Sequence, residues 1–156
     1  MSRVAVIGGG PAGIMAAAAA AGCGHNSVLL EKNEKLGKKL FLTGKGRCNI
    51  TNSCDTDDFF ANIPRNPKFL YSALYGFSNT DIVELINANG VPTKVERGKR
   101  IFPASDKSSD VIKALTRHLN NSGAELRLNT EVSGIRRAGS GFEPVSYTHL
   151  RAHETL

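Results

Sequence analysis

The strongest constraint on the fold lies in the first 31 residues, where an apolar run, a glycine-rich turn and an alanine-rich segment follow one another. Residues 4–7 are rich in Val and Ile, which predicts a short buried strand. Residues 8–13 read Gly-Gly-Gly-Pro-Ala-Gly, and residues 14–21 have high helix propensity. A second apolar strand is expected at residues 28–30. This order predicts a β-α-β unit.

The glycine spacing Gly8-x-Gly10-x-x-Gly13 then predicts a dinucleotide-binding loop. We expect Gly8 to allow the tight turn, Gly10 to let the backbone approach a pyrophosphate, and Gly13 to let the helix pack closely on the strands. Pro11 fits the first helical turn, and Ala12 is small enough to keep the approach open. The N-terminus of the helix would offer free N–H groups and a partial positive charge. The alternative is a glycine-rich turn with a purely structural role.

Glu31 ends the second predicted strand, 23 residues after Gly8. A carboxylate at this place accepts hydrogen bonds from ribose hydroxyls and disfavours a 2′-phosphate. The position therefore favours FAD or NAD over NADP.

Positive charge concentrates directly after this unit. The chain has 20 Lys and Arg against 14 Asp and Glu, a net charge of +6, which favours anionic partners. Residues 32–47 hold six basic residues and one acid, within a stretch to residue 66 that we expect to be mostly loop. Arg47, Asn49 and Thr51 offer hydrogen-bond donors to a phosphate or a flavin, and Gly46 allows close backbone approach. A long polar loop here favours FAD over a nicotinamide domain.

The rest of the chain predicts alternating helices and strands. We expect helices at residues 67–77, 80–88 and 109–121, and strands at residues 91–96, 99–102, 126–128 and 131–136. The first two of these strands would form a hairpin around Arg97 and Gly98. Together with the β-α-β unit, the pattern predicts an α/β fold with a Rossmann-like FAD/NAD(P)-binding domain.

Three blocks of sequence carry a family resemblance: residues 6–13, the pair Glu31-Lys32, and residues 43–52, which read Thr-Gly-Lys-Gly-Arg-Cys-Asn-Ile-Thr-Asn. With residues 100–107 and 129–132, they resemble a bacterial flavoprotein family that includes aminoacetone oxidase-like and bile-acid-reductase-like FAD enzymes. The resemblance covers about residues 2–143. It implies a Rossmann-like FAD domain with a substrate-side domain inserted later in the chain. It also implies a backbone contact from Val132 to the adenine side, and a place near the pyrophosphate and flavin for the residues around Arg47. The cofactor-binding residues that we expect are Gly8, Gly10, Pro11, Ala12, Gly13, Glu31, Lys32, Lys39, Gly46, Arg47, Asn49, Thr51 and Val132.

The resemblance also implies segments that this chain lacks: a later Rossmann strand, the inserted domain and a C-terminal flavin-contacting segment. We therefore expect residues 1–143 to be the N-terminal part of a Rossmann-like FAD-binding domain. Residues 144–156 resemble translated sequencing-adapter DNA and are expected to be a non-native tail. The parent protein is expected to be an FAD-dependent oxidoreductase with a small-molecule substrate, with NAD(P)H as a candidate reductant and catalytic residues outside this chain.

Other classes of function are weaker. A Rossmann protein that binds or modifies RNA would fit the net charge, but no aromatic residues interleave with the basic segment to stack bases, so a nucleic-acid partner is not expected. An NAD-only dehydrogenase conflicts with the long loop after Glu31.

Cys48 and Cys54 are one residue further apart than the Cys-x4-Cys pair of flavin disulfide reductases, and no metal-ligand spacing is present. The apolar run at residues 16–21 is too short to cross a bilayer. The odd number of cysteines, three, favours a cytoplasmic protein.

Overall fold

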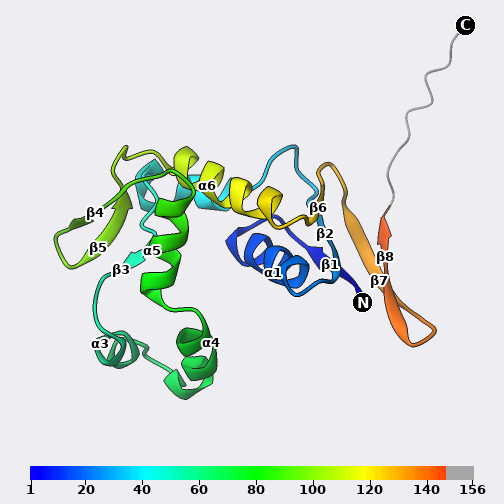
Figure 1. Cartoon of the computed structure of the whole chain (residues 1–156), viewed down its shortest axis with the longest axis horizontal. Coiled ribbons are helices and arrows are strands. Elements are labelled where there is room, and N and C mark those ends of the chain that lie inside the picture. The colour runs from blue at the N-terminus through cyan, green and yellow to red at the C-terminus, as the bar shows by residue number, and fades with distance from the viewer. Residues whose placement is uncertain (147–156) are drawn as a thin grey trace, which may run out of the picture. The chain divides into compact units, whose positions relative to one another are not determined.

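The computed structural model describes residues 1–146 and divides the chain into two compact units (Figure 1). The first unit combines Met1–Lys38 with the segment from Leu119 onward, and the second is Lys39–His118. Along the part of the chain that is described, no helix is long and apolar enough to span a membrane.

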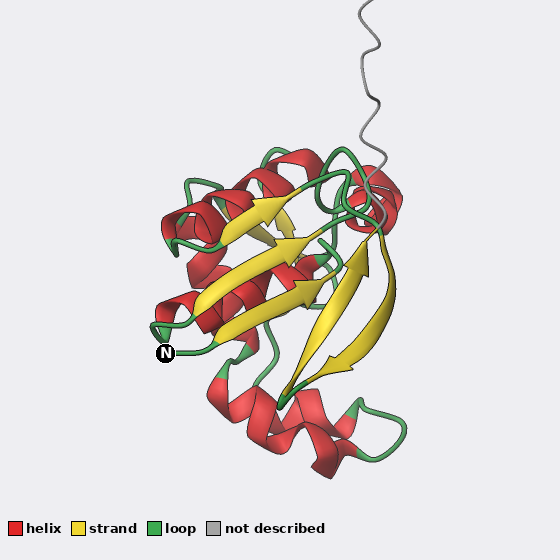
Figure 2. Cartoon of the chain, turned by 90° about the vertical axis from the view of Figure 1, so that its right-hand side faces the viewer, coloured by secondary structure: helices red, strands yellow, loops and turns green. Residues whose placement is uncertain are grey.

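A parallel three-stranded sheet forms the centre of the first unit. Its strands are β1 (Arg3–Ile7), β2 (Asn26–Leu30) and β6 (Glu125–Arg127), in the order β1-β2-β6. Figure 2 shows them as arrows that point the same way. Helix α1 (Pro11–Gly22) connects β1 to β2, which confirms the predicted β-α-β unit. The core of this unit includes Ile14, Ala17 and Ala18 on α1 and Leu29 on β2, all of which are buried.

A β-hairpin follows the sheet in the same unit. Strand β7 (Val132–Ala138) pairs antiparallel with β8 (Gly141–Ser146), with a β-bulge between Val132 and Gly134. The sequence predicted the first of these strands but not the second, because Pro144 and its successors were assigned to the tail. Pro144 lies opposite Ile135 in this hairpin. The remainder of the predicted tail, residues 147–156, lies outside the described residues.

The second unit contains a small antiparallel sheet with short helices. Strands β3 (Thr51–Asn52), β5 (Arg100–Pro103) and β4 (Thr93–Glu96) lie in that order, and β4 and β5 form the predicted hairpin. The helical segments are α2 (Lys38–Leu42), η1 (Thr43–Gly46), α3 (Thr56–Ala61), η2 (Pro67–Leu70), α4 (Tyr71–Gly76), α5 (Asn79–Ala88) and α6 (Ser108–Asn121), the last of which leads back into the first unit.

Residues 32–66 are mostly loop, as expected, because 18 of these 35 residues lie outside helices and strands; the short elements α2, η1, β3 and α3 interrupt the loop. Each of these elements has two to six residues, which is too short to produce a recognisable apolar period. Strand β4 begins at Thr93 and not at Val91, because the N–H of Val91 bonds to the carbonyl of Ile86 at the end of α5, and Pro92 has no N–H to donate.

Candidate functional site

The turn between β1 and α1 has the close packing that its glycines predict. Gly8 has a φ of +103°, in the region that favours glycine, and its N–H bonds to the carbonyl of Leu30 at 2.8 Å. A Cβ on Gly13 would lie 1.9 Å from the carbonyl oxygen of Gly8 and 3.4 Å from Leu29 Cδ1. The first turn of α1 therefore lies directly against the end of β1, with no room for a side chain at residue 13.

The N-terminal end of α1 is open. Gly10 is the N-cap residue, has no side chain to bond the helix, and has nothing within 4 Å of the place where a Cβ would stand. Pro11 occupies the first helical position, and the first turn contains no acidic residue. Within residues 1–146, the N–H groups of Ala12 and Gly13 have no hydrogen-bond partner. This end of the helix therefore offers two free donors and the positive end of the helix dipole to an anion.

Glu31 lies directly beside this turn and is almost fully buried, with 8% of its surface exposed. Its Oε2 accepts the N–H of Gly9 at 2.6 Å, and its Oε1 accepts the N–H of Asn33 at 2.8 Å and the Nδ2 of the same residue. Burial raises the pKa of Glu31, but the hydrogen bonds from Asn33 and Gly9 and the charge of Lys32 outweigh it, so the pKa lies below its ordinary value. At neutral pH the side chain is an ionised carboxylate.

Sequence reasoning missed Gly9 and Asn33. A Cβ on Gly9 would lie 2.4 Å from Leu36 Cδ2 and 2.9 Å from Glu31 Oε2, so a larger residue here would displace both of these side chains. The carbonyl of Gly9 accepts the N–H of Gly37 at 2.9 Å, which ties the turn to the segment after β2. The run of three glycines was the available signal for Gly9, because the spacing motif leaves its second position free.

The segment before β7 lies beside the end of β2. The N–H of Thr130 bonds to the carbonyl of Glu31 at 2.9 Å, and the N–H of Asn129 bonds to the carbonyl of Asn33 at 3.0 Å. Lys32 lies 3.8 Å from Glu131, with both side chains exposed. The structure thus brings Glu31, Lys32 and the segment that leads to the half-buried Val132 to one end of the glycine turn.

The remaining predicted site residues belong to the second unit. Lys39 is exposed on α2, whereas Gly46, Arg47, Asn49 and Thr51 all lie in the turn between α2 and β3 or at its end. This turn is tightly wound, since Gly44, Lys45, Gly46 and Cys48 all have positive φ angles. With its amide oriented to satisfy both partners, Asn49 donates to the carbonyls of Thr51 at 3.1 Å and Ile101 at 3.3 Å. Its side chain therefore bonds to the backbone of its own unit.

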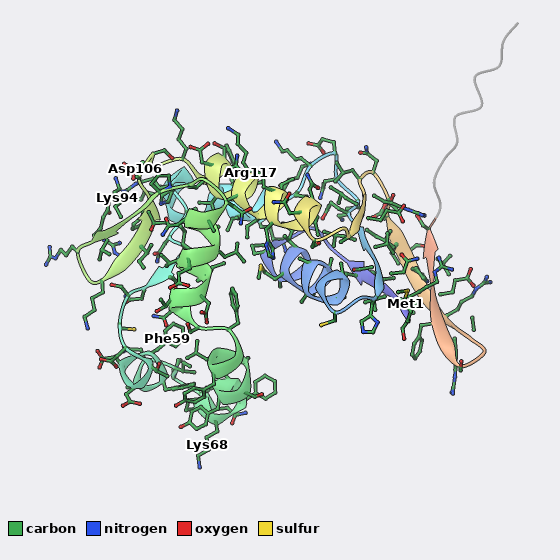
Figure 3. All side chains as sticks on the ribbon, in the orientation of Figure 1. Met1, Phe59, Lys68, Lys94, Asp106 and Arg117 are labelled. Atoms are coloured by element: carbon green, nitrogen blue, oxygen red, sulfur yellow. The ribbon has the colours of Figure 1, made fainter. Side chains whose placement is uncertain are left out.

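Arg47 has partners that its sequence position did not suggest. Its guanidinium donates to Asp106 through Nε at 2.9 Å and also bonds to Glu96, and it lies 4.4 Å from the centre of the Phe102 ring. Lys94 completes the cluster, with its Nζ 2.6 Å from Asp106 (Figure 3). Hydrogen bonds to Glu96 and Asp106 raise the pKa of Arg47, and the same cluster lowers the pKa of Asp106, through Lys94 and then Arg47. The charge that we expected to face a phosphate is balanced by two carboxylates of its own unit.

The cysteines are free thiols in different surroundings. Cys48 is buried, and burial raises its pKa against a smaller opposing effect of a hydrogen bond with Thr43. Cys54 is half-buried and lines a cavity of about 630 Å³ together with Phe59 and Ile63. In residues 1–146, no three side chains of the metal-binding types gather into a cation site.

Two curated proteins are similar to this chain in sequence. The chain is 33% identical over 144 residues to the 3-dehydro-bile acid delta(4,6)-reductase of Clostridium scindens, and 29% identical over 137 residues to the ribosomal RNA dihydrouridine synthase of Escherichia coli. These matches cover 91% and 88% of this chain. The chain spans about a third of the length of each relative, 34% in both cases.

Solved structures show the same fold at low identity. Thermovibrio ammonificans THI4 superposes with a TM-score of 0.58 at 12% identity, over 91% of this chain and 44% of its own. The open conformation of a flavocytochrome c3 fumarate reductase gives 0.55 at 24% identity, over 86% and 28%. Both matches cover less than half of the solved chain, in agreement with the expectation that this chain holds the N-terminal part of a Rossmann-like domain. The family model described as HI0933-like protein Rossmann domain matches residues 2–155. The chain therefore belongs to the HI0933-like Rossmann-domain family.

Proposed function

We propose that this chain binds the ADP part of FAD through its first β-α-β unit and is the N-terminal part of an FAD-dependent oxidoreductase. One observation carries the proposal: the open N-terminus of α1, with free N–H groups at Ala12 and Gly13, lies beside the ionised carboxylate of Glu31. An open helix end suits a pyrophosphate, and a carboxylate at the end of the second strand suits a ribose.

Each portion of an ADP group has a counterpart in the first unit. The pyrophosphate would lie against Gly10 and the first turn of α1, where nothing lies within 4 Å of the absent Cβ. The ribose would contact Glu31, and the adenine would lie near Lys32 and the backbone before Val132. When bound, FAD supplies hydride chemistry, and the residues of this chain bind and orient it.

The proposal also includes residues and properties beyond the first unit. Lys39, Gly46, Arg47, Asn49 and Thr51 remain predicted cofactor-binding residues, although Arg47 and Asn49 bond within their own unit. The bile-acid reductase supports a small-molecule substrate for the parent protein, and we propose NAD(P)H as a candidate reductant. We place the protein in the cytoplasm and its catalytic residues outside this chain.

A second candidate follows from the names of two relatives. The proteins of Escherichia coli and Haemophilus influenzae that match this chain are called ribosomal RNA dihydrouridine synthases. A net charge of +6 fits an FAD-dependent protein that acts on RNA. RNA affinity that falls steeply as salt is raised would favour this candidate over the small-molecule substrate.

The test of FAD binding uses two alanine variants on one helix. Gly10→Ala adds a methyl group at the open end of α1, and Gly22→Ala adds one at the opposite end; neither Cβ meets an atom within 4 Å, and neither residue has a positive φ. We expect the wild-type chain to bind ADP and FAD in calorimetry, and Gly10→Ala to weaken ADP binding by about tenfold or more, because the methyl group occupies the approach of the phosphates. Gly22→Ala should bind as the wild type does. A wild-type chain that binds neither nucleotide, or a Gly10→Ala variant with unchanged affinity, would refute the proposal.

A further inference from the structure

Asn33 makes hydrogen bonds with every atom that can form one, and all its partners lie around the end of β2. Its N–H and its Nδ2 both donate to Glu31 Oε1. Its carbonyl accepts the N–H of Asn129 at 3.0 Å, and its Oδ1 accepts Lys38 Nζ at 3.0 Å. Asn33 therefore connects the Glu31 carboxylate to the segment before β7 and to the start of α2.

The partners of the Asn33 amide fix which way it points. Lys38 only donates hydrogen bonds, so it must face the amide oxygen, whereas an ionised carboxylate only accepts them, so Glu31 must face the amide nitrogen. A flipped amide would lose both bonds. The side chain is thus held in one orientation from two sides.

This arrangement determines which part of the Glu31 carboxylate is left to bind a ligand. A carboxylate oxygen accepts about two hydrogen bonds, and Oε1 already has two from Asn33. Oε2 has one from Gly9, so it keeps capacity for one more. With 8% of the residue exposed, Glu31 can reach a ligand through a small part of its surface.

We propose that Asn33 is a positioning residue that turns the free acceptor site of Glu31 Oε2 toward the ribose and so sets the preference for a 2′-hydroxyl over a 2′-phosphate. The inference rests on the proposed function, because it needs an adenosine ribose beside Glu31. A hydroxyl can donate to Oε2, whereas a phosphate brings negative charge against an ionised carboxylate that Asn33 prevents from rotating away.

The experiment compares Asn33→Ala with Asn120→Ala, an exposed asparagine of α6 with no side-chain bond among the described residues. Binding is measured with ADP-ribose and with 2′-phospho-ADP-ribose, which differ only in the 2′-phosphate. We expect Asn33→Ala to weaken ADP-ribose binding by about tenfold while 2′-phospho-ADP-ribose changes less, so that the ratio of the two affinities falls. Asn120→Ala should leave the ratio unchanged.

A second measurement needs no nucleotide. Carboxyl NMR titration of Glu31 should show a pKa below its ordinary value in the wild-type chain and a higher pKa in Asn33→Ala. Asn33→Asp has nearly the same shape, keeps the acceptor for Lys38, and places a second carboxylate oxygen against Glu31, so it should raise that pKa further. This variant retains the test if the alanine variant fails to fold.

The two measurements test the positioning role of Asn33 separately from the proposed nucleotide binding. An unchanged Glu31 pKa in both Asn33 variants, or an unchanged affinity ratio in a chain that binds ADP-ribose, would overturn the role of Asn33. A chain that binds neither nucleotide but shows the pKa change would overturn the proposed function and the ribose preference, and would support the hold of Asn33 on Glu31.

Discussion

The substitution Gly13→Ala tests whether the turn before α1 is as tightly packed as the structure indicates. Its Cβ would lie 1.9 Å from a backbone oxygen of Gly8, about 1 Å closer than the shortest contact that a Cβ tolerates. Relief requires α1 to move away from β1, and overpacking of this kind costs up to about 3 kcal/mol. Alanine returns about 1 kcal/mol through its higher helix propensity. The net expectation is a loss of about 2 kcal/mol, which lowers the melting temperature by roughly 4–8 °C in a chain of this size.

Thermal unfolding followed by circular dichroism measures this effect, with Gly22→Ala as the matched control. Gly22 lies in the same helix, and its Cβ would meet nothing within 4 Å, so alanine there gains helix propensity without a clash. We expect the control to melt at or above the wild-type temperature. If Gly13→Ala melts with the control, the first turn of α1 has room for a methyl group and the argument from close packing is wrong.

Two further predictions concern the second unit. The pKa of Glu96 lies below its ordinary value chiefly because of Arg47, and the pKa of Asp106 is lowered by Lys94 and Arg47. These two carboxylates therefore stabilise the folded state fully at a pH above their ordinary pKa values. This stabilisation is lost as the pH falls through the lowered pKa values. Arg47→Met should therefore weaken the dependence of the melting temperature on pH below about 5, and an unchanged acid profile would contradict the ion-pair cluster. Because burial raises the pKa of the Cys48 thiol, iodoacetamide should label exposed Cys23 in the native chain and Cys48 only after unfolding, as read by mass spectrometry; early labelling of Cys48 would contradict its burial.

Sequence reasoning predicted the elements whose signals are local. The strand, glycine turn, helix and strand of the first unit occupy consecutive residues, and each has a signal of its own in composition or spacing. The packing role of Gly13 was predicted because the third glycine of the motif is the one that lets the helix pack closely on the strand. In the structure, a Cβ at this position would collide with the carbonyl oxygen of Gly8. The hairpin of β4 and β5 was predicted for the same reason, since Arg97 and Gly98 mark its turn.

Some of the features that sequence reasoning missed depend on contacts between distant residues. Arg47 bonds to Glu96, 49 residues later, and to Asp106, 59 residues later. No spacing rule links these positions, so a basic residue in a glycine-rich turn was assigned to a phosphate. Asn33 was overlooked for a different reason: Glu31 and Lys38 are near it in the sequence, but no motif assigns a role to an asparagine two residues after the carboxylate, and its third partner, Asn129, is distant.

The uncapped start of α1 has a consequence for how long the protein survives in a cell. Ser, Thr, Asp and Asn are the residues whose side chains cap the first turn of a helix, whereas here the cap position is Gly10 and no side chain bonds the helix. A bound phosphate would supply that cap, so folding and nucleotide binding would be linked by mass action. At a nucleotide concentration 100 times the dissociation constant, the native state gains about 2.7 kcal/mol. The abundance of the protein would then follow the supply of its cofactor, and a shortage would appear first as accelerated degradation of the chain.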